Sequence, residues 1–191
     1  KNCSCATTAG TMDIPNQTAQ VCVNDVFTAI HNNDQNLDVD TFLFVLHDSP
    51  GLTLGTIYGV SDKPEFSFPV NGELGKTYYI AGNVLAQFVD LSDPCISIAQ
   101  GSPVQFYEIK YNALPSSAIC RNACLDYSLN LQGKAPFTIY AEIKNANESI
   151  LDTFFSQTAN FDFSICPEAY GLENGVYEFE ISRVTDADCE T

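Results

Sequence analysis

Short runs of alternating apolar and polar residues cover most of the chain, and turn-forming Asn, Asp, Gly and Pro residues separate them. A period of two puts successive side chains on opposite faces of an extended backbone, so the pattern predicts half-buried strands rather than helices. In the first half of the chain, the predicted strands are Gln20–Ile30, Thr41–His47, Thr53–Val60, Glu65–Val70, Thr77–Leu85 and Pro103–Tyr111. Strands at this spacing are typical of a β-sandwich.

A segment rich in Pro and Ser, Asn112–Ile119, predicts a linker between two modules. After it, the strands predicted by alternation are Leu125–Leu131, Phe137–Ile143, Ser149–Phe155, Asn160–Ile165 and Gly175–Val184. This second sandwich is smaller and is expected to lack its last strand. The chain is therefore predicted to be all-β, with one sandwich over residues 1–113 and another over residues 114–191.

The two halves share an order of features that predicts an internal repeat. The segment from Gly75 to Cys95 contains a glycine, a Tyr-bearing strand, an Asp and a Cys, and the segment from Gly175 to Cys189 repeats that order. In such a module, Tyr78 or Tyr177 is expected to form a tyrosine corner near the start of a late strand. The two ends of the chain are expected to be cuts in a longer array, or edges that another chain completes.

Eight cysteines, four in each half, favour disulfides and an oxidising extracellular location. Their spacing lacks the paired Cys/His clusters of a zinc site. In the second sandwich, the predicted pairs are Cys124–Cys166 at one pole and Cys120–Cys189 at the other. In the first, Cys5–Cys95 and Cys22–Cys95 both remain open, and Cys3 is expected to be the closing cysteine of an earlier module.

The chain is strongly acidic, with 24 Asp and Glu against 8 Lys and Arg and a formal net charge of −16. Nucleic acid is an unfavourable partner, because affinity for it comes mainly from cationic side chains. An anionic membrane surface is disfavoured for the same reason, and no apolar run approaches the ~20 residues of a membrane-spanning helix. A cation such as Ca²⁺ fits the charge better.

Acidic side chains crowd two loops that are candidate calcium sites. In the first loop, His31–Asp40, the candidate ligands are Asp34, Asp38 and Asp40, although the spacing is not that of an EF-hand. In the second loop, Asp90 and Asp93 lie beside Cys95. For the second loop, the favoured alternative is that Asp and Ser side chains cap the turn and Cys95 holds it. For the first loop, the alternative is that loops between strands are usually polar.

Catalytic motifs are missing from the sequence, so the chain is expected not to be an enzyme. The two histidines, His31 and His47, are expected to be surface or hydrogen-bonded residues rather than bases. Tyrosines are the candidates for a sugar-binding surface, namely Tyr58, Tyr107, Tyr111 and Tyr170. Tyrosine is also common in strands on propensity alone, and tryptophan, the usual sugar-stacking residue, is absent.

Six short motifs follow one another in the first part of the chain, in the order AGTM (Ala9–Met12), VCV (Val21–Val23), FVLH (Phe44–His47), TYYIAGNV (Thr77–Val84), VDLSDPC (Val89–Cys95) and GSPVQF (Gly101–Phe106). In this order they resemble the Ig-like repeat modules of large secreted Bacteroidetes surface proteins, which are gliding-motility-associated or adhesin-like and use type IX secretion. The resemblance implies two tandem Ig-like antiparallel β-sandwiches, stapled by disulfides, in a stalk, fibre or adhesin. It supplies no catalytic residues.

The function expected from the sequence is a non-enzymatic structural or adhesive segment of an extracellular, cell-surface filament or adhesin. Its expected partners are protein neighbours in the same fibre, further copies bound by edge-strand pairing, and a cell-surface glycan, but neither nucleic acid nor an inserted membrane. The only cofactor considered is Ca²⁺. The alternative function is a carbohydrate-binding module of a secreted protein.

Overall fold

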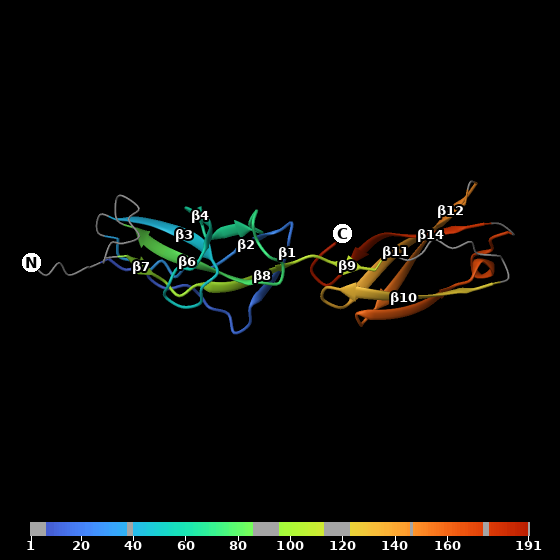
Figure 1. The fold of residues 1–191 in the computed structure, drawn as a ribbon, viewed down its shortest axis with the longest axis horizontal. Helices are drawn as coiled ribbons and strands as arrows, with labels where there is room; N and C mark the ends of the chain where they lie inside the picture. The colour runs from blue at the N-terminus through green and yellow to red at the C-terminus, as the bar shows by residue number, and fades with distance from the viewer. Residues whose placement is uncertain are drawn as a thin grey trace, which may run out of the picture. The chain divides into compact units, whose positions relative to one another are not determined.

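The computed structural model describes residues 7–37, 40–85, 96–112, 123–145, 147–173 and 176–190. The described chain is all-β apart from one short 3₁₀ helix, η1 (Pro167–Tyr170) (Figure 1). It divides into two compact units, unit 1 over Lys1–Tyr107 and unit 2 over Glu108–Thr191. The division falls after Tyr107, earlier than the boundary at 113 expected from the sequence, because residues 110 and 111 pair with a strand of unit 2.

Unit 1 contains one large sheet and one small one. The order of the large sheet is β1 (Ala19–Cys22), β8 (Ser102–Tyr107), β6 (Thr77–Leu85), β3 (Thr41–His47) and β4 (Ile57–Ser61), and β7 (Ser97–Ile98) also pairs with β6. The small sheet pairs β2 (Val26–Thr28) with β5 (Glu65–Ser67). Strand β1 runs parallel to β8, whereas the other strand pairings among the described residues of the unit are antiparallel.

The core of unit 1 lies between these two sheets. Phe44, Ile80 and Phe106 of the large sheet form one buried cluster with Phe66 of β5, and Phe27 of β2 packs against it. Alternation explains the arrangement, since β8 has buried residues at every second position. Burial of large apolar side chains in this cluster supplies most of the free energy that stabilises the unit.

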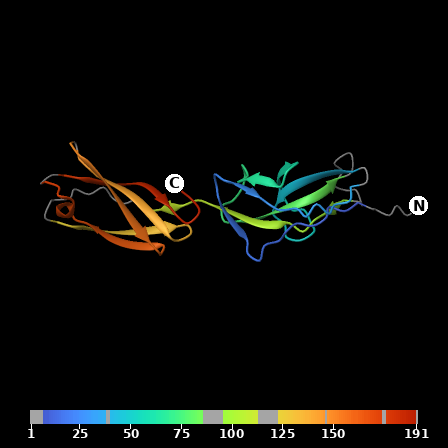
Figure 2. The same ribbon diagram turned by 180° about the vertical axis from the view of Figure 1, so that it is seen from behind.

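Unit 2 contains two three-stranded sheets, which form two layers in Figures 1 and 2. One sheet has the order β13 (Asn160–Ile165), β10 (Leu125–Gln132) and β9 (Lys110–Tyr111). The other has the order β12 (Ser149–Ser156), β11 (Phe137–Lys144) and β14 (Glu178–Thr185). Their inner faces share one core, because Tyr127 of β10 and Ile165 of β13 cluster with Ile143 of β11 and Phe179 of β14.

In each unit, a buried tyrosine lies within one residue of the start of a late strand, Tyr78 in β6 and Tyr177 before β14. The Tyr78 hydroxyl accepts a hydrogen bond from the Glu73 backbone N–H at 2.6 Å and donates to the Glu73 carbonyl at 3.2 Å. In unit 2, the Tyr177 hydroxyl donates to the Glu173 carbonyl at 3.1 Å. Both rings are fully buried. Each tyrosine therefore ties its strand to the backbone four or five residues upstream, which confirms the predicted tyrosine corner at both positions.

Several strand predictions agree with the structure. Three predicted strands have the observed bounds, namely Thr41–His47, Thr77–Leu85 and Asn160–Ile165. The predicted strand Gln20–Ile30 is wrong as a single element, because a turn after Cys22, closed by a hydrogen bond from the Asp25 N–H to the Cys22 carbonyl at 2.9 Å, separates β1 from β2. Most of the predicted linker lies outside the described residues.

Candidate functional site

The first candidate site is the loop that begins at His31, and the structure shows how this loop is attached. Isolated β-bridges pair Thr8 with Asn36 and Met12 with His31. The imidazole of His31 is buried, with its Nε2 atom 2.8 Å from the Ala9 carbonyl and its Nδ1 atom 3.0 Å from the Asn33 backbone N–H. Because a carbonyl can only accept and an N–H can only donate, the geometry requires a neutral ring protonated at Nε2. The His31 side chain thus holds the loop that begins at His31 against the segment around Ala9.

Asp34, a candidate calcium ligand, caps the facing segment. Its Oδ1 atom accepts the Thr11 backbone N–H at 2.8 Å, and its Oδ2 atom accepts the Thr11 hydroxyl at 2.8 Å. The first of these bonds is the main reason that the pKa of Asp34 lies below its ordinary value. Gly10 permits this approach, since it has a φ of 70° and a Cβ there would lie 2.4 Å from the Asp34 carboxylate. Both carboxylate oxygens therefore accept hydrogen bonds from Thr11 and stabilise the contact between the two segments.

The other candidate calcium ligands are divided between described and undescribed parts of the chain. Asp38, Asp90 and Asp93 lie outside the described residues. Asp40 is half-buried, and its backbone N–H donates to the Leu37 carbonyl at 2.7 Å. Within the described ranges, no three His, Cys, Asp or Glu side chains gather as a metal-binding group. Calcium binding stays a prediction.

His47, the second histidine, is completely buried at the end of β3. Its Nδ1 atom accepts the Ser49 backbone N–H at 3.4 Å, and its Nε2 atom has no hydrogen-bond partner among the described residues. Burial lowers the pKa of this imidazole, so the ring is neutral at physiological pH. A buried neutral ring with one weak hydrogen bond has no access to a substrate and acts as a core residue.

A charged cluster that the sequence analysis missed joins β4 to the segment after β3 and the residue before β6. The Lys76 ammonium lies 2.9 Å from Asp48 Oδ2 and 3.0 Å from the Tyr58 hydroxyl. The Asp48 carboxylate also accepts the Thr56 backbone N–H at 2.8 Å and the Tyr58 hydroxyl at 3.2 Å.

Hydrogen bonding from Lys76 lowers the pKa of Asp48 to about 2, and the hydrogen bonds that Lys76 donates to Tyr58 and Asp48 raise the pKa of Lys76. The lysine is therefore a charged ammonium at neutral pH and has no free lone pair for nucleophilic attack. No sequence motif marks this cluster, because its members are far apart in the chain and meet only through strand pairing.

The four candidate sugar-binding tyrosines are half-buried and divided between the two units. The Tyr58 hydroxyl is engaged by the charged cluster, and its ring packs edge-on against Tyr78. In unit 2, the Tyr170 hydroxyl donates to Asp152. That hydrogen bond and burial raise the pKa of Tyr170, burial being the larger cause. Neither Tyr58 nor Tyr170 presents an open ring face with a free hydroxyl.

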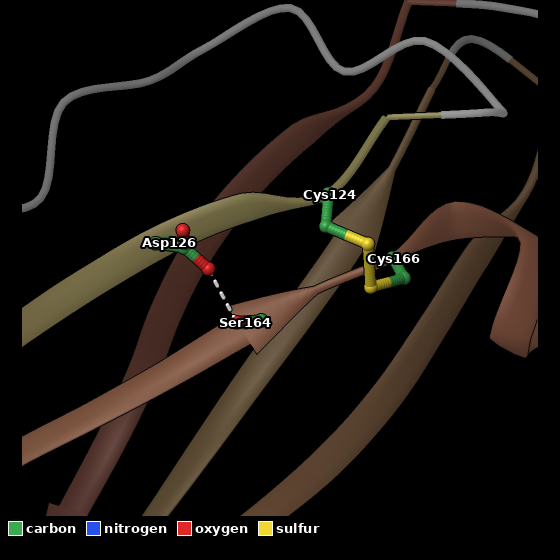
Figure 3. The surroundings of a disulfide bond; sticks show 4 residues. All are labelled: Cys124, Asp126, Ser164 and Cys166. Atoms are coloured by element: carbon green, nitrogen blue, oxygen red, sulfur yellow. Dashed lines mark hydrogen bonds between the residues drawn. A yellow bond between two sulfur atoms is a disulfide. The ribbon is translucent and has the colours of Figure 1, made fainter.

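A disulfide joins Cys124, just before β10, to Cys166, just after β13, with an S–S distance of 2.05 Å (Figure 3). This is the pair that the sequence analysis named for one pole of the second sandwich. The neighbouring Ser164 hydroxyl donates to the Asp126 carboxylate across the same two strands. Cys22 and Cys189 are disulfide-bonded too. The remaining cysteines lie outside the described residues, namely Cys3, Cys5, Cys95 and Cys120.

One shallow groove of about 220 Å³ opens on unit 1. Its lining is mostly apolar and includes Pro15, Phe27 and Ile30, with Asp13 as the one ionisable side chain. The Asp13 backbone N–H donates to the Ile30 carbonyl at 2.8 Å and so closes one side of the groove. With a single carboxylate and no facing polar cluster, the groove lacks the convergent polar groups of a specific small-molecule site.

Comparison with known proteins gave no relative: no protein-family model, no curated protein and no solved structure matches the chain. The resemblance to surface-protein modules therefore stays a prediction from sequence motifs. Within the residues that the structure describes, there is no helix with the length and hydrophobicity that a membrane span requires.

Proposed function

We propose that the chain is a non-enzymatic structural segment of an extracellular surface filament or adhesin, whose two modules hold shape between neighbours in the same fibre. The observation that carries this proposal is that ionisable side chains in the described residues are engaged in contacts within the fold. Asp34, Asp48 and His31 each bind backbone or side-chain groups of a distant segment. These contacts join segments that are distant in the chain, which is a structural role.

The topology of both units supports an Ig-like sandwich. In unit 1, a five-strand path with a parallel outer strand, β1, faces the β2–β5 pair across one core. In unit 2, the β9–β10–β13 sheet faces the β11–β12–β14 sheet. Tyrosine corners at Tyr78 and Tyr177 occur where Ig-like domains place them, at the start of a late strand.

Disulfide bonds support the extracellular location. Four of the eight cysteines, Cys22, Cys124, Cys166 and Cys189, are bonded in the described residues. Disulfides persist in secreted and cell-surface proteins and are rare where thiols are kept reduced. The acidic charge of −16 is compatible with a soluble surface segment and disfavours nucleic acid as a partner.

Single-molecule force spectroscopy on the chain, tethered through its two ends, tests this function. We expect two unfolding events, one for each unit. The parent and the C124A/C166A variant compared here both carry Cys189→Ala, because Cys189 is disulfide-bonded and the predicted Cys120–Cys189 bond would carry the force past unit 2. With the Cys124–Cys166 bond intact, the loop between these cysteines, with a sequence separation of 42, stays closed, so the extension of unit 2 falls short of that of the variant without this bond by about 150 Å at ~3.6 Å per residue.

Unfolding of both units without a measurable force would contradict a shape-holding role. Specific binding of one sugar class on a glycan array would favour the carbohydrate-binding alternative instead. The half-buried tyrosines give that alternative no support, so we expect the array to show no specific binding.

A further inference from the structure

The sheet β12–β11–β14 of unit 2 has two outer edges. Strand β12 and strand β14 each pair along their length with β11, and neither has another strand neighbour in the described part of the chain. The backbone N–H and C=O groups on the outer side of an edge strand can pair with another chain, so natural sheets usually protect such edges. The two edges of this sheet differ in how well they are protected against pairing with another chain.

Strand β14 carries two protective features. Its pairing with β11 shifts between Tyr140 and Ala141, which leaves Ser182 as an extra residue between Ile181 and Arg183. A bulge of this kind bends the strand and interrupts further pairing. The exposed face of β14 also bears charges that engage β11, because Glu180 lies 2.5 Å from Lys144 and the Arg183 guanidinium lies 4.0 Å from the centre of the Tyr140 ring.

Strand β12 has neither feature. All eight of its residues pair with β11 without a shift in register, and its sequence, SILDTFFS, contains no Lys, Arg or Pro. Its single charged residue, Asp152, accepts hydrogen bonds within the same unit from the Tyr170 hydroxyl and, at 2.7 Å, from the Thr153 backbone N–H. Where another strand pairs at Thr153, this local hydrogen bond can be exchanged for one to the partner strand. The outer face of the strand exposes two large apolar side chains, Leu151 at 77 % and Phe155 at 71 %. A long, regular edge with exposed apolar residues is the kind that recruits another strand.

We propose that β12 pairs antiparallel with β12 of a second copy of this chain, in a register centred on Thr153. Opposed residues in a β-ladder lie on the same face of the sheet, so exposed residues must meet exposed residues. In this register, Leu151 of each copy lies opposite Phe155 of the other, and the two Thr153 residues meet at the two-fold axis. Two apolar cross-strand pairs and one Thr–Thr pair then stabilise the contact.

Charge selects this register over one of its two nearest alternatives, and the other, centred on Phe154, would place Leu151 opposite Gln157, beyond the end of β12. A register centred on Asp152 would also match the faces, but it would place the two Asp152 carboxylates opposite each other, which is destabilising. Centring on Thr153 places each Asp152 opposite Phe154 instead. Two copies of a chain with a net charge of −16 repel each other, and the uncharged outer row of β12 is a place where they can approach with little local repulsion.

The resulting dimer joins two three-stranded sheets into one six-stranded sheet. One pair of edge strands buries little area, so the complex belongs to the weak or transient class. The inference extends the proposed structural function by naming a second copy as the partner. It is tested in solution, apart from the single-molecule unfolding experiment, so that either proposal can fail without the other.

Sedimentation equilibrium over a concentration series of the whole chain is the first test. We expect a monomer–dimer equilibrium that strengthens with added NaCl, since salt screens the repulsion between acidic copies. Leu151→Lys and Phe155→Lys should each weaken the dimer about tenfold or more, because a charge on the edge opposes pairing. The matched control is Leu52→Lys in unit 1, where Leu52 is 66 % exposed, and it should leave the dimer unchanged.

Cross-linking tests the register. Thr153→Cys should form a covalent dimer without reductant, since opposed Cβ atoms lie within disulfide reach. Leu151→Cys alone should not, because its copy lies four residues further along the strand, but a mixture with Phe155→Cys should. A monomer at all concentrations and salt levels would overturn the proposal. So would a dimer unaffected by both lysine substitutions, or equal self-linking of Leu151→Cys and Thr153→Cys.

Discussion

At the residue scale, several polar side chains in this protein hydrogen-bond to backbone groups of other segments and hold those segments together. Tyr78 shows the principle best, since one hydroxyl satisfies both the N–H and the carbonyl of Glu73 while the ring fills the core of unit 1. Its position, shortly after a glycine at the start of a Tyr-bearing strand, was enough to predict the corner from the sequence. The side chain therefore couples core packing to the conformation of an exposed turn.

Removal of that hydroxyl should destabilise unit 1. We expect Tyr78→Phe to lower the free energy of unfolding by about 1 kcal/mol, because two backbone hydrogen bonds are lost while the ring stays in place. Denaturant titration measures the change. Tyr140→Phe is the control, since Arg183 lies over the Tyr140 ring and no residue in the described ranges hydrogen-bonds to the Tyr140 hydroxyl. Equal effects of the two substitutions would contradict the role given to the corner.

The Asp48–Lys76 pair makes a pH-dependent contribution to stability. The pKa of Asp48 is about 2 in the folded state against an ordinary value of 3.8, so the folded state favours the carboxylate form. This contribution is complete above pH 3.8 and is lost as the pH falls towards 2. We expect Asp48→Asn to be less stable than the parent at pH 7 and to approach it at pH 2.

Unfolding midpoints at both pH values measure the Asp48 effect. Asp62→Asn is a suitable control, because Asp62 is an exposed aspartate of the same unit. Other carboxylates titrate in the same range, and this control shows how much of the change is general. If the difference between parent and Asp48→Asn stays constant from pH 7 to pH 2, the ion pair does not stabilise the fold.

At the element scale, alternation predicted strands well, but pairing remained hidden. The bounds of β3 and β6 were readable because each is a long apolar-rich run between turn residues. The break between β1 and β2 was missed, since Val23 and Val26 extend the apolar pattern through the turn. The parallel pairing of β1 with β8 joins segments about eighty residues apart. A single sequence has no local signal for such a contact.

The same limit applies to the candidate sites. The Cys124–Cys166 pair could be named because both residues flank predicted strands that meet at one pole. The contacts of His31 with Ala9 and of Asp34 with Thr11 could not, because an acidic loop reads equally as a cation site or as a set of caps. The choice depends on which segment folds over the loop, and that follows from tertiary packing.

The Cys124–Cys166 disulfide should contribute strongly to the stability of unit 2. It closes a loop with a sequence separation of 42, for which the chain-entropy account gives about 4 kcal/mol, and measured values are commonly ~2–4 kcal/mol. We expect C124A/C166A to lower the unfolding free energy of unit 2 by this amount. Denaturant titration without reductant measures it, since the other disulfides then stay intact. A change below about 1 kcal/mol would show that the bond is dispensable.

At the scale of the whole molecule, two separate cores predict two largely independent folding units. The clusters around Phe106 and around Phe179 draw their residues from different units. Changes at distant sites without shared partners usually add in free energy. A substitution in one unit should therefore leave the free energy of unfolding of the other unit unchanged.

Calorimetry of four proteins tests this independence: the parent, Tyr78→Phe, C124A/C166A and the combination of all three substitutions. We expect two transitions, of which Tyr78→Phe lowers one by about 4–8 °C and C124A/C166A lowers only the other. The combined variant should show both shifts with their individual sizes. One cooperative transition that moves with either change would mean that the units fold as one, and the chain would then transmit a local perturbation along its whole length.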